Sequence, residues 1–226
     1  MGRWDMRTVD VTERVVDHCS IPTTGLTVRM GSKKEFFYSW RRNGGSMEIV
    51  LSDYLRDSPD YILGLMVDFV FRRSSNRRAE MDNRILDHLD SDGFILHNRP
   101  LYIQRSRNLI GSEVGVHFDL MESVDRLLDN GLLHPEDITN SYMSWTCHDN
   151  RRRVGFCSTM MRVVGISSAL DSESIPDFVR DYVVYHECLH LRQRYRPDTR
   201  SHDHQFHQWE SLHPRRDEAE RILRKL

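Results

Sequence analysis

Residues 175–191 read IPDFVRDYVVYHECLHL, and the interpretation of the whole chain depends on this stretch. A proline near its start is followed by apolar residues at helical spacing, which predicts an α-helix. Residues four positions apart lie on one face of a helix, so the imidazoles of His186 and His190 can reach the same ion. Glu187 lies one position round, where a carboxylate can contact a water molecule without being a ligand. The spacing therefore predicts a helix that carries part of a metal centre.

The residues at the start of this helix are typical of a capping box. Ser174 is a suitable N-cap, Asp177 follows three positions later, and Pro176 falls in the first turn. Val179 and Val183 share the face of the two histidines, so the histidines continue an apolar row. The alternative interpretation is a pair of buried histidines whose nitrogens are satisfied by hydrogen bonds.

A catalytic zinc ion needs a third protein ligand and one open coordination position. The chain offers several donors after the helix, namely His202, His204, His207, Glu210 and His213. Residues 194–200 read RYRPDTR and predict a loop that turns the chain back toward the helix.

A second helix is predicted over residues 203–212, with Phe206 and Trp209 on its packing face. His202 would lie at the start of that helix, where its side chain can face the first helix. Glu210 follows His190 by a spacing close to that of thermolysin-like gluzincins. His202, His204 and Glu210 therefore remain alternatives for the third ligand.

The composition restricts the class of protein. A chain of 226 residues suffices for one large domain or two small ones with a buried core. Its 32 Lys and Arg residues nearly balance its 34 Asp and Glu residues, so no overall field favours nucleic acid or an anionic membrane. The apolar run ILGLMVDFVF contains Asp68 and is shorter than the roughly 18 residues that span a bilayer. We therefore expect no membrane partner and do not expect nucleic acid.

The cysteines and the N-terminal residues favour a cytoplasmic location. The four cysteines form no CxxC pair, which suits a reducing compartment. The N-terminal residues MGRWDMRTVD contain no apolar signal core. Cys157 lies in an apolar run and Cys188 faces away from the two histidines, so both are predicted to pack and to take no part in the chemistry.

Strands, turns and helices occur in a similar order in both halves of the chain. The first half contains predicted strands at 25–30, 35–40 and 47–52, a turn at 43–45, and a helix after Pro59. The second half contains a helix at 112–133, strands at 143–145 and 161–167, and the histidine-bearing helix. These patterns predict an α+β fold.

The second half also reads as a copy of the first. Residues 38–40 match 143–145, residues 47–50 match 161–164, and the two prolines that open the helices match each other. Counting from those prolines aligns Phe69, Val70 and Arg73 with the three residues of the metal motif. We therefore predict an N-terminal half at residues 1–110 that is a degenerate repeat, followed by a metal-binding domain at 111–226.

Three segments in order resemble the SprT-like and YgjP-type zincin peptidases. Residues 155–158 (GFCS) resemble the family's G-x-C-S strand, and residues 175–191 resemble its HExxH helix. Residues 202–206 (HDHQF) resemble its third-ligand segment, H-x-x-x-[FW]. The chain departs from the family at Val154, where a tryptophan is usual, and the loop after His190 is longer than in the shortest members.

The resemblance implies a compact zincin-like core in which a small sheet lies against the active-site helix. It also implies that His186, His190 and His202 bind Zn²⁺, with Glu187 as the general base of a metallopeptidase. The substrate would be a peptide or protein, and residues 161–167 are a candidate edge for it to pair with. The alternatives are a structural zinc scaffold without activity and a DNA-associated protease.

Overall fold

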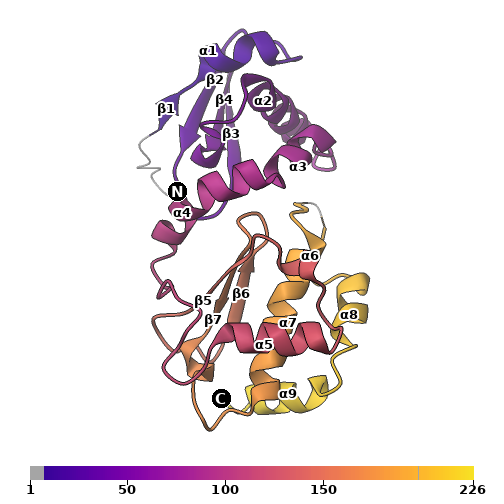
Figure 1. Cartoon of the computed structure of the whole chain (residues 1–226). Coiled ribbons are helices and arrows are strands. Elements are labelled where there is room, and N and C mark those ends of the chain that lie inside the picture. The colour runs from indigo at the N-terminus through magenta and orange to yellow at the C-terminus, as the bar shows by residue number, and fades with distance from the viewer. Residues whose placement is uncertain (1–7, 198) are drawn as a thin grey trace. The chain divides into compact units, whose positions relative to one another are not determined.

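Figure 1 shows the computed structural model, which describes residues 8–197 and 199–226. Small mixed sheets and helices make up the chain, so the predicted α+β class is confirmed. The chain divides into two compact units, unit 1 ending at Phe94 and unit 2 comprising Ile95–Leu226. No helix within the described ranges combines the length and the apolar character needed to traverse a bilayer. Most of the segment used to predict the lack of a signal sequence, residues 1–7, lies outside the described residues.

Unit 1 contains a mixed four-stranded sheet. Its elements are β1 (Val9–Asp10), α1 (Thr12–Val15), the 3₁₀ turn η1 (Val16–His18), β2 (Leu26–Gly31), β3 (Tyr38–Asn43), β4 (Ser46–Ser52), the 3₁₀ turn η2 (Asp53–Leu55), α2 (Asp60–Ser75) and α3 (Asn83–Leu89). The strand order is β1-β2-β4-β3, with β2 and β4 parallel and the other neighbours antiparallel. β3 and β4 form the predicted hairpin, and Gly44 supplies the positive φ of 59° that its tight turn requires.

Unit 2 contains a mixed three-stranded sheet. From α4 (Asp92–Ser106) onward, the elements are α5 (Leu120–Asp129), α6 (Pro135–Ile138), β5 (Tyr142–Trp145), β6 (Gly155–Ser158), β7 (Val163–Ile166), the 3₁₀ turn η3 (Ser168–Leu170), α7 (Asp177–Gln193), α8 (His204–Glu210) and α9 (Arg216–Leu223). The strand order is β5-β7-β6, with β7 parallel to β5 and antiparallel to β6.

The order of the strands in unit 2 decides which of them is an edge. The prediction that residues 161–167 form an edge is wrong, because β7 is hydrogen-bonded to β5 on one side and to β6 on the other. The outer side of β5 is also engaged, since the backbone of Trp145 hydrogen-bonds with that of Ile110 and Ser112. β6 is therefore the edge strand on the opposite side of the sheet.

Helix α7 forms the centre of unit 2. It packs on β6 and β7 and contacts α5, α6, α8 and α9, which surround it in Figure 1. A helix enclosed in this way needs apolar side chains around most of its circumference. Residues of several faces are fully buried, namely Val179, Val184, Tyr185, Cys188 and Leu189.

The start of α7 differs from the predicted capping box. Its N-cap is Pro176, and no side chain caps the first turn. Ser174 lies two positions too early, and its hydroxyl hydrogen-bonds with that of Ser172. The carboxylate of Asp177 pairs with Arg180 in place of the backbone. Packing of the apolar faces, and not a cap, therefore defines this helix.

The helix predicted at residues 112–133 is shorter in the structure. α5 begins only after Asp119, whose side chain is its N-cap. The carboxylate of Asp171 accepts hydrogen bonds from the backbone N–H groups of residues 116–118, which holds this segment outside the helix. His117 consequently does not lie on α5.

The two units have the same arrangement of three strands and a helix. The strands compared are β2, β3 and β4 in unit 1 and β5, β6 and β7 in unit 2. In each set the first and third strands are parallel, and the second pairs antiparallel with the other side of the third. A 3₁₀ turn precedes the helix in both units. Pro59 and Pro176 are the N-caps of α2 and α7. The predicted match of residues 38–40 with 143–145 is wrong, because β3 is the second strand of its set and β5 is the first.

Close packing of α2 against η1 can be tested at Gly64. A Cβ there would lie 2.4 Å from the backbone carbonyl oxygen of His18. We expect Gly64→Ala to lower the free energy of unfolding by about 1–3 kcal/mol, although alanine is the better helix former by about 1 kcal/mol. Gly93→Ala is the matched control, because a Cβ there meets nothing within 4 Å in α4. Urea denaturation measures both, and equal midpoints would contradict this packing.

Candidate metal centre

Helices α7 and α8 together position the histidines. His186 and His190 lie on one face of α7, as their spacing predicted. α8 is fixed against α7 by the Tyr185 hydroxyl, which donates a hydrogen bond of 2.6 Å to the carbonyl of Trp209. Phe206 of α8 is completely buried, as expected of an anchor, and its ring stacks on that of His190 with centroids 4.6 Å apart. These contacts bring the residues just before α8 next to the two histidines.

Three imidazoles converge at one point. Nε2 of His202 lies 3.2 Å from Nε2 of His186 and 3.2 Å from Nε2 of His190. The ligand atoms of the three residues all lie within 4.8 Å of one another, close enough to hold one metal ion. Tetrahedral zinc with Zn–N bonds of about 2.0–2.1 Å would separate neighbouring ligand nitrogens by about 3.3 Å. The spacing observed therefore fits a zinc-sized ion.

The second nitrogen of each helix histidine is hydrogen-bonded elsewhere. Nδ1 of His186 lies 2.8 Å from a carboxylate oxygen of Glu210, and Nδ1 of His190 lies 3.3 Å from the amide oxygen of Gln193. Oxygens of these kinds are acceptors, so each Nδ1 carries the proton and each Nε2 presents its lone pair. The Nε2 lone pairs of neighbouring imidazoles repel one another at this distance. A cation bound between the nitrogens would accept these lone pairs and so remove the repulsion.

Two histidines of the cluster, His190 and His202, have lowered pKa values that favour the neutral imidazole. Burial, together with the neighbouring His186, lowers the pKa of His190 to about 4. Burial also lowers the pKa of His202. A neutral imidazole is the form that binds metal ions.

Glu210, one of the alternatives for the third ligand, hydrogen-bonds with His186 and is not one of the three converging residues. Its side chain is buried, with a residue exposure of 5%. Burial alone would raise its pKa, but hydrogen bonds from His186, His207 and Tyr182 hold it at about 2. The carboxylate is therefore ionised and can fix the ring of His186. His204, the other alternative, is exposed on α8 and is not one of the three converging residues.

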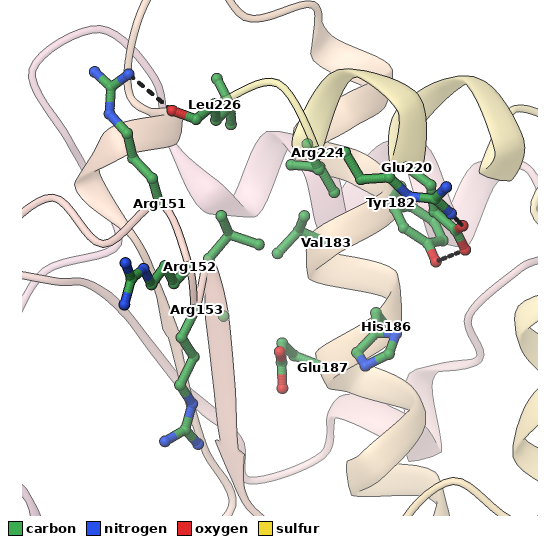
Figure 2. A pocket seen from close by; sticks show the side chains of 13 residues that line it. Arg151, Arg152, Arg153, Tyr182, Val183, His186, Glu187, Glu220, Arg224 and Leu226 are labelled. Carbon is green, nitrogen blue, oxygen red and sulfur yellow. Dashed lines mark hydrogen bonds and ion pairs between the residues drawn. The ribbon is translucent and has the colours of Figure 1, made fainter.

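Glu187 lies beside this cluster and is 7% exposed. Burial raises its pKa to about 7, while His186 and Arg153 act to lower it. Gly155 of β6 makes room for this carboxylate, since a Cβ there would lie 2.5 Å from Oε1 of Glu187. Glu187 and His186 face a cleft of about 800 Å³, with Arg151, Arg152 and Arg153 on its opposite wall (Figure 2).

The two cysteines nearest the site are passive. Burial raises the pKa of both Cys157 and Cys188, so both remain thiols at neutral pH. All four cysteines of the chain are free. The sequence interpretation missed the contributions of Gln193 and Gly155. Gln193 follows His190 by three positions, a helical spacing from which this contact was predictable.

The chain matches no protein-family model, no curated protein and no solved structure. The function proposed below is therefore argued from the geometry of the site.

The first test of the site is metal stoichiometry. We expect about one Zn²⁺ per chain, and the double variant His186→Ala/His190→Ala should bind none, because only one of three converging imidazoles remains. His202→Ala should weaken Zn²⁺ binding strongly in a chelator competition. His204→Ala is the matched control on the neighbouring exposed position and should bind normally. Full stoichiometry in the double variant would contradict this site.

The second test concerns the role of Glu210. Loss of a hydrogen-bond partner of a metal-binding histidine typically costs about 10–100-fold in metal affinity. We expect Glu210→Ala to show such a loss, and Glu210→Gln a smaller one because its amide oxygen still accepts from His186. If Glu210→Ala weakened binding as much as His202→Ala, Glu210 would be a ligand itself.

Proposed function

We propose that the chain is a zinc-dependent metallopeptidase. The observation that carries the proposal is the combination of three converging histidine nitrogens with a buried carboxylate, Glu187, that binds none of them. Open coordination beside such a carboxylate is the arrangement that catalytic zinc sites require. The resemblance of residues 155–158, 175–191 and 202–206 to the SprT-like and YgjP-type zincins supports the same conclusion.

A bound zinc ion would polarise the scissile carbonyl and lower the pKa of a water molecule. Glu187 takes a proton from this water molecule and passes it to the leaving amine nitrogen. A pKa of about 7 suits both steps, because such a group accepts and releases protons readily near neutral pH. His186, His190 and His202 would hold the ion, and Glu210 fixes the ring of His186 through its hydrogen bond.

The substrate that suits this site is an extended peptide. The N–H of Ser167 donates to the carbonyl of Val154, so the backbone of Val154 faces the β7 side of the sheet. Orientation alternates along a strand, and the backbone groups of Gly155 and Cys157 therefore face the outer edge of β6. A peptide that adds to this edge would run beside Glu187.

Two alternatives are less well supported. A structural zinc site in a scaffold has no use for a buried, unliganded carboxylate such as Glu187, whose desolvation is costly. A DNA-associated protease would bind a polyanion, whereas the chain carries a net charge of −2.

We also infer that unit 1 is a degenerate copy of the strands and helix of unit 2. Counted from the N-cap prolines, Phe69 and Arg73 of α2 occupy the positions of His186 and His190 in α7. The ring of Phe69 is fully buried, with the Tyr38 ring 5.3 Å away and the guanidinium of Arg73 5.6 Å away. In unit 1, the side chains of Phe69 and Arg73 therefore pack against each other at the positions that correspond to the proposed metal ligands of unit 2.

Substitution of the proposed general base separates the enzyme from the scaffold. Glu187→Gln keeps the size of the side chain and all three proposed ligands, so Zn²⁺ binding and thermal stability should be retained. Peptide hydrolysis should fall by about 10²–10⁴-fold, the usual contribution of a general base. Unfolded casein and a library of extended peptides are suitable substrates.

The control for this experiment is the double variant His186→Ala/His190→Ala, which should lose hydrolysis together with zinc. Equal hydrolysis by Glu187→Gln and the unaltered protein would refute the role of Glu187. If the zinc-loaded protein cleaves no peptide at all, the scaffold replaces the peptidase as the better account.

A further inference from the structure

We propose further that the cleft beside Glu187 selects peptides with acidic side chains close to the bond that is cleaved. This inference rests on the proposed function and adds the substrate class to it. The observations are the residues of the cleft walls, the pairing of their charges, and the position of the cleft along the edge strand.

Three consecutive arginines form one wall of the cleft. Arg151, Arg152 and Arg153 lie before β6, separated from it by Val154, and line the cleft opposite α7, as Figure 2 shows. All three are exposed to solvent. A peptide that adds to the outer edge of β6 would pass along this wall, because the same backbone continues from Arg153 into the strand. Its side chains would then meet guanidinium groups on the wall across the cleft from Glu187.

Arg152 and Arg153 form no ion pair with the acidic groups of the cleft. Glu220 is already shared by Arg216, at 3.1 Å, and Arg224, at 2.9 Å. Arg151 donates to a main-chain oxygen of Leu226, so its guanidinium is already engaged. Within the described part of the chain, no carboxylate lies within ion-pair distance of Arg152 or Arg153. The wall therefore carries an excess of positive charge, to which a bound dication would add.

The remaining lining favours a peptide over a nucleic acid. Val154, Val183 and Leu223 give the cleft an apolar floor that suits the aliphatic parts of side chains. Single-stranded nucleic acid is usually bound through aromatic platforms on which bases stack. The aromatic residue of this cleft, Tyr182, is largely buried, and its hydroxyl hydrogen-bonds with Glu210 and Glu220.

Binding to the inactive Glu187→Gln protein tests the proposal without relying on turnover. Two fluorescent peptides are compared by anisotropy, identical except that one carries glutamates and the other glutamines on both sides of the central bond. We expect the acidic peptide to bind at least about tenfold more tightly at low salt, with the difference shrinking as salt screens the charges. The double substitution Arg152→Gln/Arg153→Gln should remove most of this preference. Arg221→Gln, on α9 but outside the cleft lining, is the matched control and should keep it.

The same titration with zinc removed by a chelator identifies the source of the preference. The preference for the acidic peptide should persist, because the arginines remain. If the preference vanishes, the glutamates of the peptide bind the metal and the proposal is overturned. Equal affinity for the two peptides also overturns it. So does a single-stranded DNA oligomer that binds more tightly and displaces the acidic peptide, which would make the wall a phosphate site.

Failure of this inference is distinguishable from failure of the proposed function. If the unaltered protein hydrolyses both peptides equally well and binds them equally, it is a peptidase without acidic preference. If the acidic peptide binds selectively but is never cleaved, the cleft recognises acidic chains and the peptidase proposal fails.

Discussion

The burial of α7 is the constraint on which the rest of unit 2 depends. The helix is enclosed by two strands and four helices, and it must nevertheless carry two imidazoles and a carboxylate. Buried polar groups are tolerated only where each finds a partner. The surrounding elements therefore do more than cover apolar surface. They supply the carboxylate oxygen that His186 needs and the room that Glu187 needs.

These requirements explain features of α7 and α8 that otherwise look unrelated. The 17 residues of α7 run far enough to place Gln193 beside the last histidine. From α8, Glu210 hydrogen-bonds with His186, and the ring of Phe206 stacks on that of His190. A bidentate pair between Arg192 and the buried Asp137 ties the end of α7 to α6, with bonds of 2.8 and 2.6 Å. A metal site is precise only when its ligands are held in this way.

Unit 1 shows what the same strand arrangement does without this chemistry. Its helix α2 starts after a proline as α7 does, but its buried positions are filled by apolar and aromatic groups. Tyr38 occupies the position on β3 that Gly155 occupies on β6, each paired with the residue that lies two positions before the 3₁₀ turn of its unit. A tyrosine there packs on Phe69, whereas a glycine leaves space for the carboxylate of Glu187. At this position of the edge strand, unit 1 therefore has an aromatic side chain where unit 2 has room for a carboxylate.

The sequence by itself determined the features that depend on local spacing. The helices that begin after Pro59 and Pro176, the hairpin turn at Gly44, and the shared face of His186 and His190 follow from patterns over a few residues, and the structure has all of them. Only the tertiary structure decided which donor joins those histidines, because that depends on the path of a loop and the docking of α8. It also turned Glu210 from a rival ligand into a hydrogen-bond partner. The edge strand was decided in the same way: β7 follows β6 in the chain but lies between β5 and β6, since strand order arises from pairing between distant residues that no local pattern records.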